Sequence, residues 1–372
     1  MQKESISSRQ GISILIMFLF GSSVIMGVST EAGQDGWFSL LLAVAFFIPV
    51  ALVYARIMRL YPKKDIFEIM ETALGKPAGK ILTVLLSLYA VHLSALVLRN
   101  FSEFIQVIAL PKTPQLTMMI GMLLVTVYLA RSGAKALGRW SLVAIILVLA
   151  VVVFTVVFSI DRMRFEHIQP VLVHDLPKIA SGAFNIFSFP FAESVLLLGI
   201  ASAIKKKDSP YKLYIFGALL GAAVLLVVIL RNLFVLGPAM LQADYFPSYT
   251  AARIVRVADF LSRIEGSISM NLILAGIVKI TLCLLAASKG TARLIGLEDY
   301  RQIVLPVGLI VLALCTVLYK NIMEMFDFVR FYPYYALPFQ VILPILVWIA
   351  AEIRTRKQKN VSGRKIRKVR MA

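Results

Sequence analysis

The chain has 372 residues, of which 59% are hydrophobic and only 16% charged, and its mean hydropathy is +0.84. Soluble domains are ~45–50% apolar, so this composition predicts an integral membrane protein and excludes a soluble one. The net charge of +19 comes from Lys and Arg between the apolar runs and at the C-terminal end. That distribution is typical of an anionic membrane face and predicts anionic lipid, not nucleic acid, as the partner.

The sequence lacks the motifs that would indicate an enzyme or a metal protein. Its three histidines have no ligand spacing, and Cys283 and Cys315 lie inside apolar runs, where small core residues are expected. It contains no phosphate-binding loop, no GxSxG and no paired carboxylates. We therefore expect no catalytic activity, no cofactor and no metal site.

Ten apolar runs follow one another along the chain and are predicted as transmembrane helices. They cover residues 11–30, 37–54, 81–104, 115–130, 140–160, 182–202, 211–236, 267–288, 303–318 and 334–353. The first run resembles a signal peptide, but the many later spans favour an uncleaved helix. We expect one all-α polytopic domain over residues 1–353, followed by a disordered polybasic tail at 354–372.

Two of the connecting segments carry amphipathic patterns that predict short helices on the membrane surface. Asp65 followed by Glu68 resembles a capping box, and apolar residues then recur at helical spacing. After span seven, residues 254–264 place apolar side chains on one face and charged side chains on the other.

Spans one, three and seven carry polar residues inside apolar runs. Residues 21–23 of span one fit either a small-residue packing face or a local unwinding. In span three, His92 is expected to be a hydrogen-bonded core residue, and Arg99 is expected to pair with Glu103 one turn later. Arg231, near the end of span seven, is expected to extend its charge to the membrane surface.

Span six is apolar enough to enter a bilayer but has features that a simple anchor lacks. Pro190 removes a backbone donor and clashes with the preceding turn, and Glu193 is ionisable at membrane depth. Because carbonyls freed in lipid need a partner, a broken helix there is usually buried in protein or lines a cavity. We expect the ligand site around Phe187 to Glu193; the alternative is a proline-kinked helix with a satisfied polar residue.

Lys279, near the middle of span eight, is a second charge at membrane depth. An unpaired charge at the bilayer centre costs ~2.5–3.5 kcal/mol on insertion scales, so we expect an ion pair between Glu193 and Lys279. Two alternatives remain open. Lys279 acts as a fixed cation in place of a coupling ion, or it is structural and extends its long stem toward the surface.

The Lys and Arg residues divide unequally between the two sides of the predicted spans. Both chain ends and alternate loops hold 27 of the 39, the opposite loops hold 9, and three lie within spans. Positive residues concentrate on the cytoplasmic side of membrane proteins, so this bias predicts cytoplasmic N- and C-termini.

Ten spans divide into two sets of five, about residues 11–160 and 180–353. Spans one and six, which have the clearest break signals, occupy corresponding places and would run in opposite directions. That arrangement is typical of the LeuT-type 5+5 inverted repeat, which holds its ligand at the midplane between two broken helices. Half-helix N-termini there attract a carboxylate, and unwound carbonyls accept from an ammonium group. The predicted ligand-binding residues are Gly21, Ser22, Ser23, Tyr89, Leu93, Phe187, Ser188, Phe189 and Glu193.

Short segments spread over nearly the whole chain carry a resemblance to a known family. They are Ile6-Ser7-Ser8-Arg9-Gln10, Glu31-Ala32-Gly33-Gln34-Asp35-Gly36-Trp37, Pro190-Phe191-Ala192-Glu193, Asp299-Tyr300-Arg301, Leu305-Pro306-Val307-Gly308-Leu309 and Tyr334-Tyr335-Ala336-Leu337-Pro338-Phe339. In this order they resemble the B subunit, the permease-like membrane component, of bacterial spore germinant receptors. The family usually has glycine where Ala192 stands and a second glycine soon after Gly21, so ligand specificity is not carried over.

The resemblance implies a ten-helix protein of the amino acid–polyamine–organocation superfamily in the inner membrane of a dormant spore. It implies a complex with an A-type membrane subunit and a C-type lipoprotein subunit. It also implies a small nutrient ligand, often an amino acid, whose binding triggers germination. A proton-coupled amino acid transporter would use the same fold and remains the alternative. A purely structural scaffold fits poorly with two charges at membrane depth.

Overall fold

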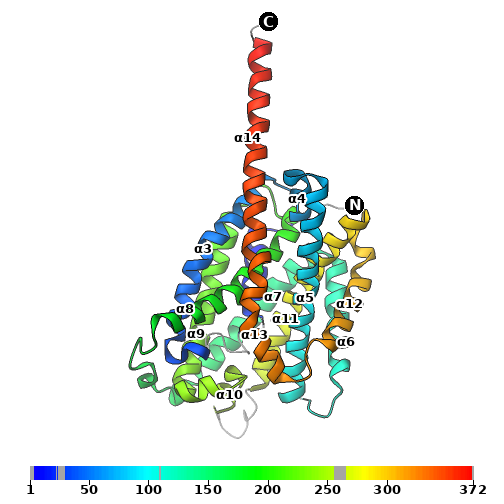
Figure 1. The fold of residues 1–372 in the computed structure, drawn as a ribbon. Coiled ribbons are helices and arrows are strands. Elements are labelled where there is room, and N and C mark those ends of the chain that lie inside the picture. The colour runs from blue at the N-terminus through cyan, green and yellow to red at the C-terminus, as the bar shows by residue number, and fades with distance from the viewer. Residues whose placement is uncertain (1–3, 22, 24–29, 109, 255–264, 371–372) are drawn as a thin grey trace.

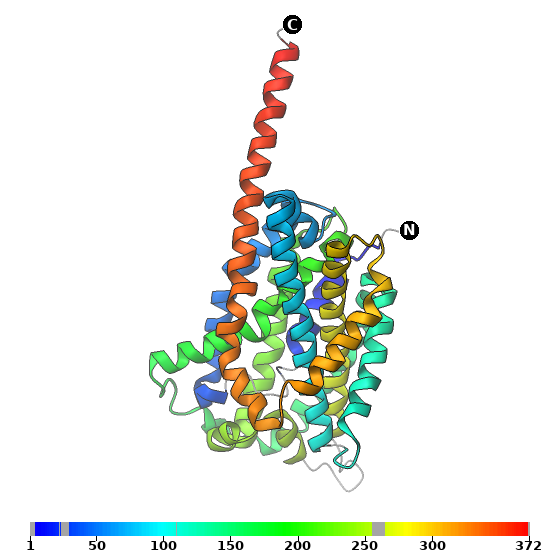
Figure 2. The ribbon, with the colours of Figure 1, turned by 45° about the vertical axis from the view of Figure 1, so that its right-hand side comes forward.

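The computed structural model describes residues 4–21, 23, 30–108, 110–254 and 265–370. This part of the chain is helical apart from turns, loops and an isolated β-bridge between Ile6 and Ile204. The helices form one bundle, and α14 projects from the face at which the N-terminal segment also lies (Figure 1). The turned view shows α10 and the hairpin between α5 and α6 at the opposite face (Figure 2).

Each predicted run coincides at least in part with a helix, but some bounds differ: the first helix ends at Phe20, whereas the predicted run extends to residue 30, and the helix leading into the tenth run begins at Ile322 and not at residue 334. The first part of the chain contains α1 (Ser8–Phe20), η1 (Thr30–Asp35), α3 (Gly36–Leu60), α4 (Ile66–Leu74), α5 (Lys76–Ile108), α6 (Gln115–Ser132), α7 (Ala134–Val157), η2 (Ile160–Arg162) and η3 (Phe165–Ile168). The second part contains α8 (Leu176–Ile186), η4 (Phe187–Phe191), η5 (Ala192–Ala203), α9 (Pro210–Ala243), α10 (Pro247–Ile254), α11 (Glu265–Ile295), η6 (Tyr300–Gln302), α12 (Val304–Val317), α13 (Ile322–Leu337), η7 (Pro338–Ile342) and α14 (Leu343–Arg370). Among the described residues, eight helical stretches are long and apolar enough to cross a membrane, and α1 and α12 are shorter apolar helices.

The helices that carry Glu193 and Lys279 are the most enclosed of the bundle. In the most apolar window of each stretch, 89% of the residues from α8 to η5 and 78% of those in α11 are buried, against 33% in α6 and α7. A bilayer solvates apolar side chains on the outer helices, so polar residues are tolerated best at the centre. The two predicted charges therefore lie in the middle of the protein.

Helix α1 reaches this centre because it packs unusually close to α9. A Cβ atom on Gly217 would lie 2.6 Å from Leu15 Cδ2, and one on Gly221 would lie 2.8 Å from Leu19 Cδ1. Only glycine permits this approach, which is how small residues bring membrane helices together. Helix α1 begins at a capping box in which Ser7 and Gln10 satisfy each other's backbone N–H groups.

Two predictions about the polar segments have different outcomes. The helix after Asp65 is confirmed as α4, and Asp65 Oδ1 accepts a hydrogen bond from the Glu68 backbone N–H at 3.1 Å. The prediction of a disordered tail at 354–372 is wrong, because α14 continues without interruption to Arg370. Lys and Arg are good helix formers and no proline ends the helix. Residues 255–264 of the second predicted surface helix lie outside the described residues.

Candidate functional site

Span six is broken where the sequence places Pro190. Helix α8 runs into the π-type turn η4, in which Phe189 has extended dihedral angles (φ −128°, ψ 107°), and η5 continues as a 3₁₀ helix. The carbonyls near the break are satisfied by side chains from other helices. Ser188 O accepts from Gln340 Nε2 at 3.0 Å, and Ala192 O accepts from Tyr54 Oη at 3.2 Å. Protein side chains thus satisfy the carbonyls that the break frees, which is required where lipid offers no water.

Glu193, the second residue of η5, forms an ion pair at the centre of the bundle. Lys279 Nζ lies 2.5 Å from Glu193 Oε2, and both side chains are completely buried. Tyr332 donates to the other oxygen, Glu193 Oε1, at 2.6 Å. Both carboxylate oxygens are therefore occupied, and the burial of each charge is offset by a charged or hydroxyl partner.

A chain of hydrogen bonds extends from Tyr332 back to the break. Tyr89 Oη lies 2.9 Å from Tyr332 Oη, and Gln340 Nε2 donates to Tyr89 Oη at 2.9 Å. Gln340 Oε1 in turn accepts from Ser188 Oγ at 3.0 Å. The network joins η4, α5, α13 and η7, so a change at any of its members reaches the backbone of span six.

The ammonium group of Lys279 also lies against aromatic rings and a glycine. Its Nζ is 5.0 Å from the ring centroid of Phe18 and 4.6 Å from that of Phe189, within the range of cation–π attraction. A Cβ atom on Gly21 would lie 2.9 Å from Lys279 Cδ. Helix α1 ends at Phe20, and Gly21 has non-helical dihedrals (φ −7°, ψ −120°). The end of α1 therefore shapes the space around the lysine.

The structure brings together most of the predicted site but not all of it. The residues that meet in one network or in contact with it are Gly21, Tyr89, Ser188, Phe189, Glu193 and Lys279. Ser23 Oγ instead donates a hydrogen bond back to the Leu19 carbonyl near the end of α1. Phe187 stacks on Phe184 at 6.3 Å between ring centroids, and Leu93 is buried in the apolar core one turn from Tyr89. Ser22 lies outside the described residues.

The sequence reasoning missed three members of the network. Tyr332 lies two residues before the tenth predicted span, Gln340 lies within that span, and Tyr54 lies at the end of the second. Gln340 carried a usable signal, because it is a lone amide two residues after Pro338 in an otherwise apolar run. The tyrosines carried none, since tyrosine is common at membrane interfaces and in cores alike.

Three other predicted polar residues have clear positions. Arg99 pairs with Glu103 at 2.7 Å, as predicted. His92 Nδ1 lies 2.9 Å from Tyr335 Oη, which confirms a hydrogen-bonded histidine. The prediction that Arg231 extends to the surface is wrong: it is 2% exposed, because α9 continues to Ala243 and α10 packs against it.

The arrangement places charged and hydrogen-bonding groups together inside the bundle. Among the described residues, no group of three or more His, Cys, Asp or Glu side chains could hold a metal ion. The chemistry on offer is a carboxylate, an ammonium and a set of hydroxyl and amide groups next to an interrupted backbone. These are the groups with which membrane transport proteins bind small polar ligands at the midplane.

Two solved structures match this chain over most of its length and support a LeuT-like fold. MhsT in complex with L-phenylalanine matches with a TM-score of 0.67 at 15% identity, covering 93% of this chain and 89% of that chain. The nucleobase-cation-symport-1 family transporter Mhp1, with bromovinylhydantoin bound, matches with a TM-score of 0.69 at 11% identity, covering 92% and 78%. At these identities the likeness establishes a LeuT-like fold alone.

Sequence comparison identifies the protein family. The family model described as a spore germination protein, Spore_permease, matches residues 5–325. The "Spore germination protein KB" of Bacillus subtilis (strain 168) is 26% identical over 99% of this chain and its own full length. The "Putative spore germination protein YfkT" of the same organism is 26% identical over 86% of this chain and 87% of its own length. The protein is therefore a multi-pass membrane protein and not a member of an enzyme family: it belongs to the Spore_permease family of spore germination proteins.

Proposed function

We propose that this chain is the permease-like subunit of a spore nutrient germinant receptor and that it binds a small nutrient, an amino acid, at the Glu193–Lys279 pair. The observation that carries the proposal is this fully buried ion pair, with Nζ 2.5 Å from Oε2, beside the broken backbone of span six. Buried ionisable residues in a membrane protein mark ligand and ion pathways.

The chemistry of the pair favours a zwitterionic ligand. Separating Glu193 from Lys279 leaves two buried charges, and each costs several kcal/mol unless it finds a new partner. An amino acid supplies both partners, an ammonium for Glu193 and a carboxylate for Lys279. An uncharged sugar supplies neither, so it would have to bind with the pair intact and use the hydroxyl and amide groups of Tyr89 and Gln340.

The proposed architecture is a single ten-span domain over residues 1–353, with repeats at about 11–160 and 180–353. The two short apolar helices, α1 and α12, added to the eight longer stretches support ten spans. The excess of Lys and Arg in alternate loops supports cytoplasmic N- and C-termini, in the inner spore membrane. The positive α14 extension, residues 354–370, would lie beside anionic lipid headgroups.

In this proposal the ligand acts by shifting a population between two states. A ligand changes such an equilibrium only through its different affinity for the two states. Opening the ion pair would move η5 relative to α11, and A-type and C-type receptor subunits would detect that movement. Gly21, Ser22, Ser23, Leu93 and Phe187 would contribute to the walls of the opened site.

A proton-coupled amino acid transporter is the second candidate, and one observation favours it. Once the ligand and its ammonium group have left, Glu193 has no cationic partner until Lys279 returns to it. A buried carboxylate without a cation takes up a proton, which would couple ligand and proton movement.

Reconstitution of the purified chain in liposomes tests both candidates. We expect saturable binding of one or more radiolabelled amino acids, without accumulation under an imposed proton gradient, and loss of binding in Glu193→Gln. The matched control is Gly121→Ala, because a Cβ atom there meets nothing within 4 Å. Accumulation that collapses with the gradient would establish the transporter instead. Binding that survives in Glu193→Gln would contradict the proposed site.

A further inference from the structure

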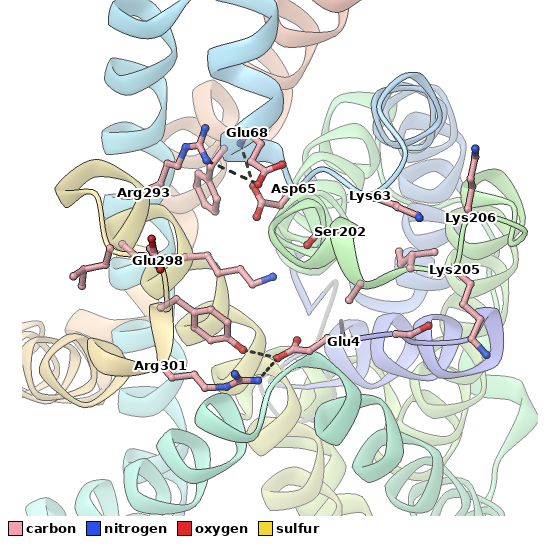
Figure 3. Close-up of a pocket in the computed structure, with 18 of the residues that line it drawn as sticks. Glu4, Lys63, Asp65, Glu68, Ser202, Lys205, Lys206, Arg293, Glu298 and Arg301 are labelled. Carbon is pink, nitrogen blue, oxygen red and sulfur yellow. Dashed lines mark hydrogen bonds and ion pairs between the residues drawn. The ribbon is translucent and has the colours of Figure 1, made fainter. Parts of the chain in front are cut away.

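A cavity of about 750 Å³ lies at the face of the bundle that carries the N-terminal segment. It is bounded by residues 4–5, the segment from Lys63 to Glu68, residues 202–207 at the end of η5 and just beyond it, and the end of α11 with the loop that follows (Figure 3). Its volume falls within the range of ligand pockets, ~300–1,000 Å³. It is separate from the buried Glu193–Lys279 network, none of whose members lines it.

Positive charge predominates in the lining of this cavity. Its basic members are Lys63, Lys205, Lys206, Lys207, Lys289, Arg293 and Arg301, and its acidic members are Glu4, Asp65, Glu68 and Glu298. Four separate segments of the chain contribute the basic residues. A general excess of positive charge at one membrane face does not require this concentration around one hollow.

The acidic residues are largely engaged with other groups. Glu4 Oε1 accepts from Arg301 Nη2 at 2.7 Å and from Tyr300 Oη at 3.1 Å (Figure 3), and its Oε2 accepts from the Ala134 backbone N–H at 3.0 Å. Asp65 caps α4. Arg293 Nη2 lies 2.7 Å from Glu71 Oε2, outside the cavity lining. The two arginines of the lining, Arg293 and Arg301, therefore each have a carboxylate partner.

The lysines of the lining, unlike the arginines, have no carboxylate partner among the described residues. Within the described residues, no ion pair involves Lys63, Lys205, Lys206, Lys207 or Lys289. Lys289 Nζ lies over the ring of Tyr300, 5.5 Å from its centroid. An ammonium is a compact, strongly hydrated charge that binds phosphate well. Several such groups around one cavity favour a ligand that carries several negative charges close together.

We infer that this cavity binds a ligand with clustered phosphate groups, either a soluble polyphosphate or the headgroup of a phosphorylated lipid. The bound anion would bridge the lysines after η5 to Lys63 and Lys289. Lys205, Lys206 and Lys207 lie just after η5, the element that carries Glu193, and Lys289 lies on α11, the helix that carries Lys279. Bridging them would hold these two elements together at this face and would oppose their separation.

The N-terminal segment adds to the same contact. Ile6 donates its backbone N–H to Ala203 O at 2.8 Å and accepts from the Lys205 N–H at 3.2 Å. The segment thus fixes the chain that carries the three consecutive lysines while leaving their side chains exposed. The cavity is therefore a preformed basic site that opens next to the membrane surface.

The test uses the purified full chain in nanodiscs of neutral lipid with inorganic tripolyphosphate as the probe. Equilibrium dialysis measures binding, and lysine acetylation followed by mass spectrometry reports which lysines the probe protects. The test variant is Lys63→Gln/Lys205→Gln/Lys206→Gln. The control is Lys76→Gln/Lys80→Gln/Lys135→Gln, which removes the same charge from exposed lysines that do not line the cavity. Thermal unfolding of both variants checks that they fold.

We expect saturable binding that weakens at least about tenfold in the test variant and little in the control, because the cavity lysines contact the anion directly. A second set of nanodiscs contains cardiolipin, a lipid with two phosphate groups in one headgroup. If the same lysines are protected only in these nanodiscs, the ligand is a lipid headgroup. Equal loss of binding in both variants, or no protection under either condition, would overturn the proposal. Because the test measures tripolyphosphate binding at a separate cavity, its result does not depend on whether a nutrient binds at Glu193.

Discussion

Lys279 and Arg301 each hold a glutamate at nearly the same distance, 2.5 Å from Glu193 and 2.7 Å from Glu4, and each glutamate also accepts from a tyrosine, yet the two pairs differ in burial. The first pair is completely buried, whereas the side chains of the second are 35% and 19% exposed. Water screens the outer pair and hydrates either partner when the other is removed. The inner pair has no such replacement, so burial and not distance determines what each contact is worth.

The largest effect should come from breaking the inner pair on one side only. Lys279→Met leaves Glu193 buried without a cation and should lower the free energy of unfolding by about 3–5 kcal/mol. The double variant Lys279→Met/Glu193→Gln removes both charges and should recover part of that loss. Thermal unfolding in detergent, followed by tryptophan fluorescence, measures both. A double variant no more stable than the single one would show that the two charges are not coupled.

The hydroxyl of Tyr332 should come next. Tyr332→Phe removes a donor to Glu193 and a partner of Tyr89, and should cost about 1–3 kcal/mol because buried polar groups lose their hydrogen bonds. Tyr334→Phe is the control, since Tyr334 lies two residues away and is 66% exposed. Equal unfolding temperatures for the two variants would argue against the network.

The space beside Lys279 can be tested without changing any charge. Gly21→Ala places a Cβ atom 2.9 Å from Lys279 Cδ and 3.1 Å from Phe18 O, and should cost about 1–3 kcal/mol through overpacking. Gly121→Ala adds the same atom to a helix where nothing lies within 4 Å, and should be neutral or slightly stabilising. A tolerated Gly21→Ala would mean that α1 and α11 can separate freely.

The outer pair should give a small and salt-dependent effect. Glu4→Gln removes the charge that Arg301 contacts and should cost about 1 kcal/mol or less, since both side chains remain in contact with water. The difference from the unmodified protein should shrink as salt is raised. A loss as large as that of Lys279→Met, or one that salt does not change, would contradict the comparison.

The smallest effect concerns Glu71 at the same outer face, and its sign depends on pH. The hydrogen bond from Arg293 holds the pKa of Glu71 below its ordinary value of 4.5. A lowered pKa stabilises the folded state above that ordinary value, and the contribution is lost as pH falls through the folded-state pKa. Arg293→Gln should therefore cost at most about 1 kcal/mol near neutral pH and progressively less below pH ~4.5. Unfolding temperatures of both proteins across this range measure it; a difference that grows as pH falls would contradict it.

Prediction from sequence worked best for residue types that are unfavourable inside an apolar span. Pro190 and Glu193 stood out because a proline and a carboxylate are both unfavourable in an apolar span, and the break does lie between Phe187 and Phe191. Arg231 shows the limit of that reasoning. Its distance from the predicted span end suggested access to water, but α10 covers it. Local position does not reveal what a later segment will pack against.

By itself the sequence determined that this is a helical membrane protein and that Glu193 and Lys279 lie inside its apolar segments. Those results follow from the bilayer, which demands apolar side chains and internally satisfied backbone at every span. Only the tertiary structure decided which polar groups meet. Tyr332 lies 139 residues from Glu193, and Gln340 lies 152 residues from Ser188, in hydrogen bonds that no local pattern encodes. The basic cavity likewise exists because folding brings distant loops to one face, where their lysines share a single hollow.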